Sequence, residues 1–159
     1  MKNNKGFSLV ELIIVIAIMA VLVGVLAPTY MQYVEKSKKS NDVSTVDTIV
    51  NAIEIAAIDP ETQSDDWKRL EITITSTGMT IEEFKAVSGG TKDAAADANM
   101  TNAVTKITGT DVKFKNNWGG DVKFTATKGD YGTVTFTWNT GVGKTDAFKK
   151  YATSITKIS

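Results

Sequence analysis

The chain has 159 residues and a formal net charge of zero, because 18 lysine and arginine residues balance 18 aspartate and glutamate residues. This length suffices for one domain with its own core, or for one domain with an appendage. The balanced charge removes the electrostatic case for a nucleic-acid-binding protein. The absence of cysteine and histidine excludes disulfides, thiolate metal sites, cysteine nucleophiles and imidazole chemistry. We therefore expect no enzyme activity, no metal site and no cofactor.

An apolar run near the N-terminus is long enough to cross a membrane. Between Phe7 and Ala27 the one ionisable side chain is Glu11. About 21 residues at about 1.5 Å per residue give roughly 31 Å of helix, the thickness of a bilayer's hydrocarbon core. The basic residues 1–6 are typical of a secretory signal peptide, but the run is long for one, and Pro28 should block cleavage after Ala27. A plain membrane anchor is left open by length alone.

Glu11 distinguishes these interpretations. An acidic side chain in a spanning helix is unfavourable by about 2.5–3.5 kcal/mol at mid-membrane, and by less near the interface. A segment that served only as an anchor could carry leucine there, so we expect Glu11 to have a cationic partner. The candidates are Lys2, Lys5, a lipid headgroup, or the N-terminal amine of a neighbouring chain.

A contiguous motif covers the start of the apolar run. It reads Lys5-Gly6-Phe7-Ser8-Leu9-Val10-Glu11-Leu12, and the run then continues to Pro28. The motif resembles the class III signal of type IV pilins and the related pseudopilins. This resemblance implies that a prepilin peptidase cuts between Gly6 and Phe7 and methylates the new amine of Phe7. It also implies that Glu11 meets the amine of an adjacent subunit during assembly.

The helix is expected to continue beyond the apolar run, from Phe7 to about Ile58, over roughly 75–80 Å. Asp59-Pro60 should end it, because the residue before a proline avoids the helical region. Residues 36–42 lack an apolar stripe and predict a solvated neck. After the neck, residues at helical spacing form one apolar face that needs a cover: Val43, Val46, Ile49, Val50, Ile53 and Ala57.

Gly24 and Pro28 mark the weakest part of this helix. Proline lacks an N–H and its ring crowds the carbonyl four residues earlier, here that of Gly24. Glycine is itself a poor helix former. We therefore expect a kink or melting point between Gly24 and Pro28.

The remaining residues predict an α+β head in which the helix packs on an antiparallel sheet. Alternating apolar residues predict strands at 70–74, 112–114, 122–126 and 134–138. The capping box of Thr80 and Glu83 predicts a short helix there, and further helices are expected within 93–107 and at 145–151. Short turns between consecutive strands favour an antiparallel meander, whose apolar face the helix stripe would cover.

Two patterns in the head invite other functions. The segment Gly141-Val142-Gly143-Lys144-Thr145 is similar to the end of a phosphate-binding loop, but that pattern requires a glycine where Trp138 stands. A turn leading into a helix is the better interpretation. Four dispersed aspartates could bind calcium, although surface loops explain them better: Asp111, Asp121, Asp130 and Asp146.

The resemblance divides the chain into a leader (1–6), an N-terminal helix (7–58, hydrophobic over 7–28) and a head (59–159). The short leader and Phe7 are similar to type IVa pilins, whereas residues 118–122 and the strands after them are similar to type IVb pilins. The implied fold is the pilin fold, in which many members close the C-terminal region with a disulfide that this chain cannot form.

Three functions are compatible with this sequence. The first is a structural subunit that polymerises helically into a type IV pilus fibre on the bacterial surface. The second is a pseudopilin of a type II secretion or DNA-uptake machine, and the third is a membrane-anchored binding domain that never polymerises. For the pilus, the implied partners are other copies of the chain, the prepilin peptidase, the inner-membrane assembly platform, minor pilins and membrane lipid. The subunit would span the cytoplasmic membrane once, with its head outside, and then enter the extracellular fibre.

Cleavage between Gly6 and Phe7 is directly testable. Intact-mass measurement on the membrane-extracted protein should show the loss of residues 1–6 and the gain of one methyl group. A side chain at position 6 should obstruct the peptidase, so a Gly6→Leu variant should keep its leader. Retention of residues 1–6 by the wild-type chain, in a host that carries the peptidase, would contradict the prediction.

Overall fold

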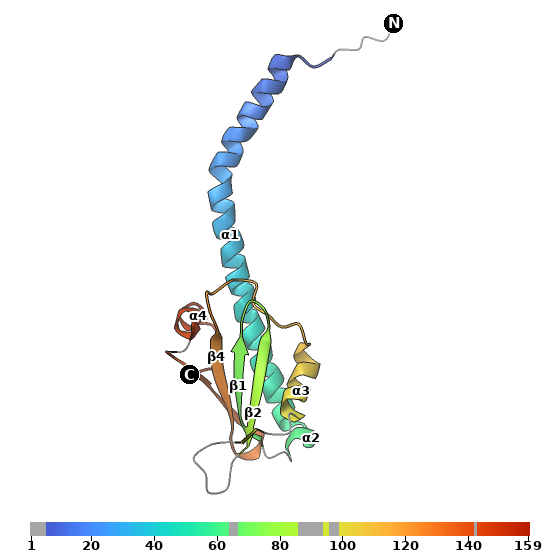
Figure 1. Ribbon diagram of the computed structural model, residues 1–159, viewed down its shortest axis with the longest axis vertical. Coiled ribbons are helices and arrows are strands. Elements are labelled where there is room, and N and C mark those ends of the chain that lie inside the picture. Colours follow the sequence, from blue (N-terminus) through green and yellow to red (C-terminus); the bar gives the residue numbers. More distant parts are fainter. Residues whose placement is uncertain (1–5, 64–66, 86–93, 96–98, 142) are drawn as a thin grey trace. The chain divides into compact units, whose positions relative to one another are not determined.

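The computed structural model describes residues 6–63, 67–85, 94–95, 99–141 and 143–159 (Figure 1). By its internal contacts the chain divides into two units, Met1–Ser37 and Lys38–Ser159. Helix α1 (Leu9–Ile58) is common to both. The predicted α+β class is confirmed, with a long N-terminal helix whose C-terminal part packs on an antiparallel sheet.

In the first unit, α1 carries the apolar run. Its most apolar 18-residue window has a mean hydropathy of 3.1, and none of that window is buried. By length and composition this helix could cross a membrane. The helix passes through Gly24 and Pro28 without interruption, so the predicted kink at these residues stays a prediction.

The sheet of the second unit has five strands in the order β3-β2-β1-β4-β5, and all neighbours are antiparallel. Its members are β1 (Trp67–Ile74), β2 (Met79–Lys85), β3 (Ala94–Ala95), β4 (Val122–Lys128) and β5 (Val134–Trp138). Further helices are α2 (Pro60–Gln63), α3 (Asn99–Thr108) and α4 (Thr145–Tyr151), with a short 3-10 turn η1 (Asp130–Gly132).

The core lies between α1 and one face of the sheet. Alternate residues of β1 and β4 are fully buried, as expected where one face of an antiparallel sheet is covered and the other is solvated. The predicted helix stripe supplies the cover, with Val43 half-buried and these members buried: Val46, Ile49, Val50, Ile53 and Ala57. The prediction that the stripe packs on the sheet is therefore confirmed.

Several local predictions are also confirmed. Strands β1, β4 and β5 lie where alternation placed them, and α4 has the predicted bounds. Helix α3 occupies the later part of the predicted helical region. The earlier part is not helical at Ala94–Ala95, which form strand β3, and residues 93 and 96–98 lie outside the described residues. Helix α1 ends at Ile58, directly before Asp59-Pro60.

Three local predictions were wrong. The segment from Thr80 to Glu83 forms strand β2, not a helix. Pairing wins over the local capping pattern, because Ile72 faces Ile81 and Ile74 faces Met79 across β1 and β2. Residues 112–114 form no strand, and Phe114 is instead buried from a loop. The prediction of a solvated neck over residues 36–42 is wrong at Asp42, whose side chain is fully buried.

Glu83 caps helix α3, although Glu83 itself lies in strand β2 and not in the helix predicted for residues 80–83. Its side chain is buried in β2, and its Oε2 accepts hydrogen bonds from the Thr101 N–H (3.0 Å) and the Thr101 hydroxyl (3.2 Å). Thr101 lies in the first turn of α3, where backbone N–H groups lack helical partners. The carboxylate thus joins α3 to the sheet.

The C-terminus is held without a disulfide. Ile158 is buried and pairs with Phe136 in a parallel bridge. The Ser159 N–H donates to the Phe136 carbonyl (3.1 Å), and the Trp138 N–H donates to the Ser159 carbonyl (3.0 Å). Lys157 adds an ion pair with Glu54 of α1 (2.6 Å). These contacts take the place of the covalent closure that the sequence rules out.

Candidate functional site

Three regions carry the candidate functional groups: the start of α1, the surroundings of Asp42, and a groove beside α3. Gly6 and Phe7 lie in non-helical chain, with one residue between them and the start of α1, and both are exposed. The Phe7 side chain is 91% exposed. The predicted cleavage point between Gly6 and Phe7 therefore lies in accessible, non-helical chain, as a peptidase requires.

Ser8 and Glu11 form a capping arrangement that the sequence prediction missed. Glu11 Oε2 accepts a hydrogen bond from the Ser8 N–H (2.8 Å), and the Ser8 carbonyl accepts the N–H of Leu12 (3.2 Å). A Ser-x-x-Glu spacing is the known signal for this cap, and it stands in the sequence at residues 8–11. A carboxylate in the first turn is also stabilised by the helix dipole.

The cap gives Glu11 a local partner within the monomer. Its predicted partners Lys2 and Lys5 lie outside the described residues. One carboxylate can accept several hydrogen bonds, so the Ser8 N–H leaves acceptor positions for a cation. Glu11 can therefore act in two ways: as a cap on its own helix, and as the anionic partner of a cation from another molecule.

Gly24 and Pro28 lie within exposed helix. A side chain at Gly24 would meet no atom within 4 Å in the described structure. Packing inside the monomer thus does not explain this glycine, and its role as a helix-weakening residue beside Pro28 stays a proposal.

Asp42 is the functional group that sequence reasoning placed wrongly. Its carboxylate is fully buried and accepts three hydrogen bonds from one loop. The donors are the Lys115 N–H (2.6 Å), the Asn116 N–H (3.0 Å) and the Trp118 Nε1–H (2.9 Å). Hydrogen bonds to a charged group contribute about 1.5–3 kcal/mol each, which offsets the desolvation of the carboxylate.

A sequence signal for this site did exist. Asp42 lies four residues before Val46, so it continues the apolar stripe by one turn. A charged residue in line with a buried stripe indicates a buried carboxylate that needs donors. The glycine- and asparagine-rich turn around Trp118 offers such donors, but nothing local in the sequence joins two segments that are so far apart along the chain.

Aromatic rings surround the Asp42 loop. Phe148 of α4 stacks on Phe114 with ring centroids 5.1 Å apart, and it contacts the Trp118 ring edge-on at 5.0 Å. Trp118 also lies 5.9 Å from Tyr151. Lys39 Nζ is 5.8 Å from the Trp118 centroid and 5.9 Å from that of Tyr151. Aromatic packing and the Asp42 hydrogen bonds thus fix α4 and the loop against α1.

The glycine-rich segment before α4 is a structural turn. Gly143 has a φ of +58°, and a Cβ there would come within 2.4 Å of the Asp121 carbonyl oxygen, so only glycine fits. The Lys144 N–H donates to that same carbonyl (2.7 Å). The Thr145 hydroxyl accepts the Lys123 N–H (2.9 Å). These groups hold β4 and α4 together, as the turn interpretation predicts, rather than facing a phosphate.

The four aspartates considered for calcium lie apart. Asp111 pairs with Lys113 (2.9 Å), and Asp121 lies 3.8 Å from Lys123. Asp146 Oδ2 accepts the Gly141 N–H (3.2 Å). Over the part of the chain that the structure describes, no three acidic side chains gather into a metal-binding group.

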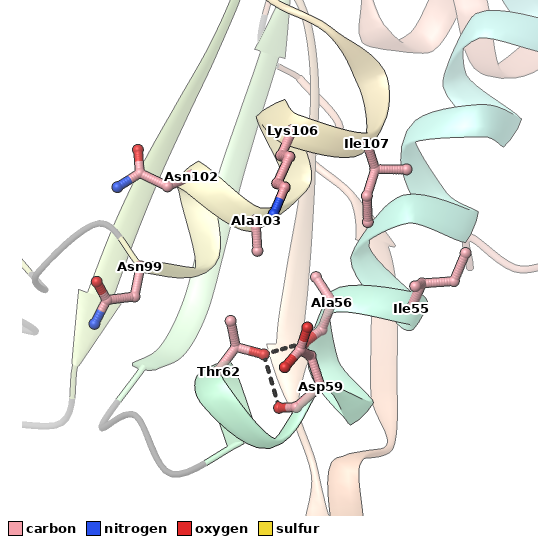
Figure 2. A pocket seen from close by; sticks show the side chains of 9 residues that line it. All are labelled: Ile55, Ala56, Asp59, Thr62, Asn99, Asn102, Ala103, Lys106 and Ile107. Atoms are coloured by element: carbon pink, nitrogen blue, oxygen red, sulfur yellow. Dashed lines mark hydrogen bonds between the residues drawn. The ribbon is translucent and has the colours of Figure 1, made fainter.

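A groove lies between the C-terminal end of α1, α2 and α3 (Figure 2). Thr62 lines the groove, and its hydroxyl donates to the carbonyl oxygens of Ala56 and Asp59. Its walls mix aliphatic and polar side chains, which are Ile55, Asn99, Asn102, Ala103, Lys106 and Ile107. Ile55 and Ile107 are also exposed. The groove offers apolar contact area but no convergent set of reactive groups.

Comparison with known proteins found a match for the region around the start of α1. Residues 1–27 match the family model described as the prokaryotic N-terminal methylation motif. They carry the class III signal of type IV pilins and pseudopilins. Such a signal implies processing by a prepilin peptidase and assembly into a multi-subunit filament. No curated protein and no solved structure matched the chain.

Removal of the Asp42 carboxylate should destabilise the head. In a fragment of residues 34–159, which should be a soluble folded monomer, Asp42→Ala should lower the free energy of unfolding by about 2–4 kcal/mol, because it removes three hydrogen bonds to a buried carboxylate and leaves three partly buried donors unpaired. Asp47→Ala, an exposed change on the same helix, should stay within about 0.5 kcal/mol of wild type. Urea denaturation measures both. Equal stability of the two variants would show that the Asp42 hydrogen bonds contribute nothing net.

Proposed function

We propose that this chain is the structural subunit of a type IV pilus. It would be cut between Gly6 and Phe7, methylated at Phe7 and polymerised helically with other copies of itself. The observation that carries this proposal is a single carboxylate, Glu11, which lies within the class III signal and in an exposed apolar helix. The apolar helix fits a membrane-anchored pilin. Assembly of this pilin into an extracellular fibre is our proposal.

The apolar run supports this proposal through its exposure. Large apolar side chains from Leu9 to Leu26 are at least half exposed, and a surface of that kind is not stable in water. A bilayer can cover it before assembly, because the run has the length of a membrane span. Equivalent helices of neighbouring subunits can cover it afterwards. One helix thus serves both as the anchor of the monomer and as the core of the fibre.

Glu11 would give this otherwise non-directional packing a register. Cleavage creates a positive amine at Phe7, and opposite charges attract far more strongly in a low-dielectric core than in water. Contact between the amine of one subunit and Glu11 of the next joins two different surfaces. Such heterologous contacts propagate as open helices instead of closing into rings.

A pseudopilin of a type II secretion or DNA-uptake machine has the same signal and the same build. Helix α3, which adds to the head between β3 and β4, favours a pilus subunit over a short piston. Long surface fibres in electron micrographs, lost when the gene is deleted, would support the pilus. A secretion or DNA-uptake defect without such fibres would support the pseudopilin.

Glu11→Val should abolish fibres while the processed protein accumulates in the membrane. Insertion should be kept or strengthened, because a carboxylate is unfavourable in lipid. The amount of sheared fibre, measured against membrane-bound protein, tests this. Because valine also removes the cap on Ser8, a second variant is needed.

Glu11→Gln is that second variant. Glutamine can replace glutamate in the capping arrangement, but it carries no charge, so fibres should be lost here too. Ser8→Ala, which removes a hydroxyl and keeps the N–H that Glu11 accepts, is the matched control and should assemble normally. Wild-type amounts of fibre from Glu11→Gln would show that assembly does not need the Glu11 charge and that Glu11 acts as a cap only.

A further inference from the structure

Lys39, Trp118 and Tyr151 form a compact cluster at the start of the unit that begins at Lys38. The lysine Nζ lies within 6 Å of both ring centroids, and the rings contact each other. Trp118 packs on buried Phe148 and donates a hydrogen bond from Nε1 to buried Asp42. The cluster is therefore part of a rigid surface.

Further lysines extend this cluster. Lys115 lies in the loop that Asp42 holds. The Lys144 side chain lies over Gly120, 3.2 Å from the position that a Cβ there would take. The exposed side chains of α4 also include lysines next to Tyr151. We define the basic aromatic patch as Trp118, Tyr151 and five lysines, namely Lys39, Lys115, Lys144, Lys149 and Lys150.

Acidic groups near the patch are already engaged. Asp42 is buried beneath three donors. Asp121 lies beside Lys123, and Asp146 accepts the Gly141 N–H. The donors to Asp42 and Asp146 are neutral N–H groups, so these aspartates keep their negative charge. The lysines of the patch outnumber the three aspartates, which gives the surface around the two rings a positive excess on a chain whose total charge is zero. In Figure 1, α4 lies beside the N-terminal end of the part of α1 that belongs to the unit Lys38–Ser159.

We propose that the basic aromatic patch binds anionic phospholipid headgroups and so seats the head on the membrane before assembly. The proposal rests on the membrane-held subunit described above. Tryptophan and tyrosine favour the interface between lipid and water. Lysines near an anionic membrane surface are attracted to it, and their long side chains reach headgroups easily.

Chain connectivity keeps the patch near the bilayer. Lys38, directly before Lys39 of the patch, is ten residues after Pro28, and ten residues of any conformation span at most about 33–36 Å. The apolar run ends just before Pro28, so its outer end lies at the membrane surface when the run spans the bilayer. The patch is thus tethered within reach of the headgroups, where even weak attraction acts at high effective concentration.

Hydrogen exchange of the full-length protein in nanodiscs, at one copy per disc, tests this proposal. The discs contain phosphatidylcholine alone or phosphatidylcholine with phosphatidylglycerol. Peptides covering 115–120 and 145–151 should exchange at least about tenfold more slowly with the anionic lipid. The variant Lys149→Glu/Lys150→Glu should lose this protection. Lys68→Glu/Lys106→Glu, which makes the same change in net charge on exposed lysines elsewhere, should retain it.

The other outcomes are equally decisive. Residues 9–27 should be protected in both discs, and exchange-exposed amides there would overturn the membrane-held subunit itself. If residues 9–27 are protected but exchange in the patch peptides does not slow with phosphatidylglycerol, the lipid proposal fails and the membrane-held subunit stands. Equal protection by inorganic phosphate in neutral discs would assign the patch to free anions. Protection in detergent without lipid, rising with protein concentration, would assign it to a second copy of the chain.

Discussion

The uncovered apolar surface of α1 is the constraint on which the rest of the chain depends. From Leu9 to Leu26 this surface has no partner in the described structure, and burial of apolar area is worth about 25 cal/mol per Å². The chain must therefore meet lipid or other subunits to be stable. Glu11 then becomes informative, because it interrupts a surface that would otherwise associate without register. The same helix turns amphipathic after the neck and becomes the cover of the sheet.

The head is held to this helix by two kinds of contact. One is the apolar stripe on the sheet, which is strong but tolerates sliding. The other is directional: Asp42 accepts three hydrogen bonds from the 115–118 loop, and Lys157 near the C-terminus pairs with Glu54. Directional contacts at both ends of the packed segment fix the register of helix on sheet. A chain without cysteine thereby holds both its loop and its C-terminus in place.

Sequence reasoning succeeded where one pattern decided the structure. The helix stripe and the alternating strands β1, β4 and β5 followed from spacing, and the class III signal followed from the resemblance of one contiguous motif. It failed where distant segments decide. The Thr80–Glu83 pattern suits a helix start, but β1 offers it a strand partner, and Glu83 then caps α3 instead. Asp42 lies among the lysines of the neck, a position that predicts a solvated side chain. The prediction fails because the donors to its carboxylate come from a loop more than seventy residues later in the chain.

Cryo-electron microscopy of sheared fibres tests the central claim most directly, because it locates Glu11 and the new N-terminus in the assembled state. We expect the Phe7 amine of one subunit to lie within about 4 Å of the Glu11 carboxylate of a neighbour, the range of an ion pair. Both groups should be buried in the fibre core. A map in which Glu11 contacts only its own Ser8 N–H, with every neighbouring amine out of reach, would contradict the account.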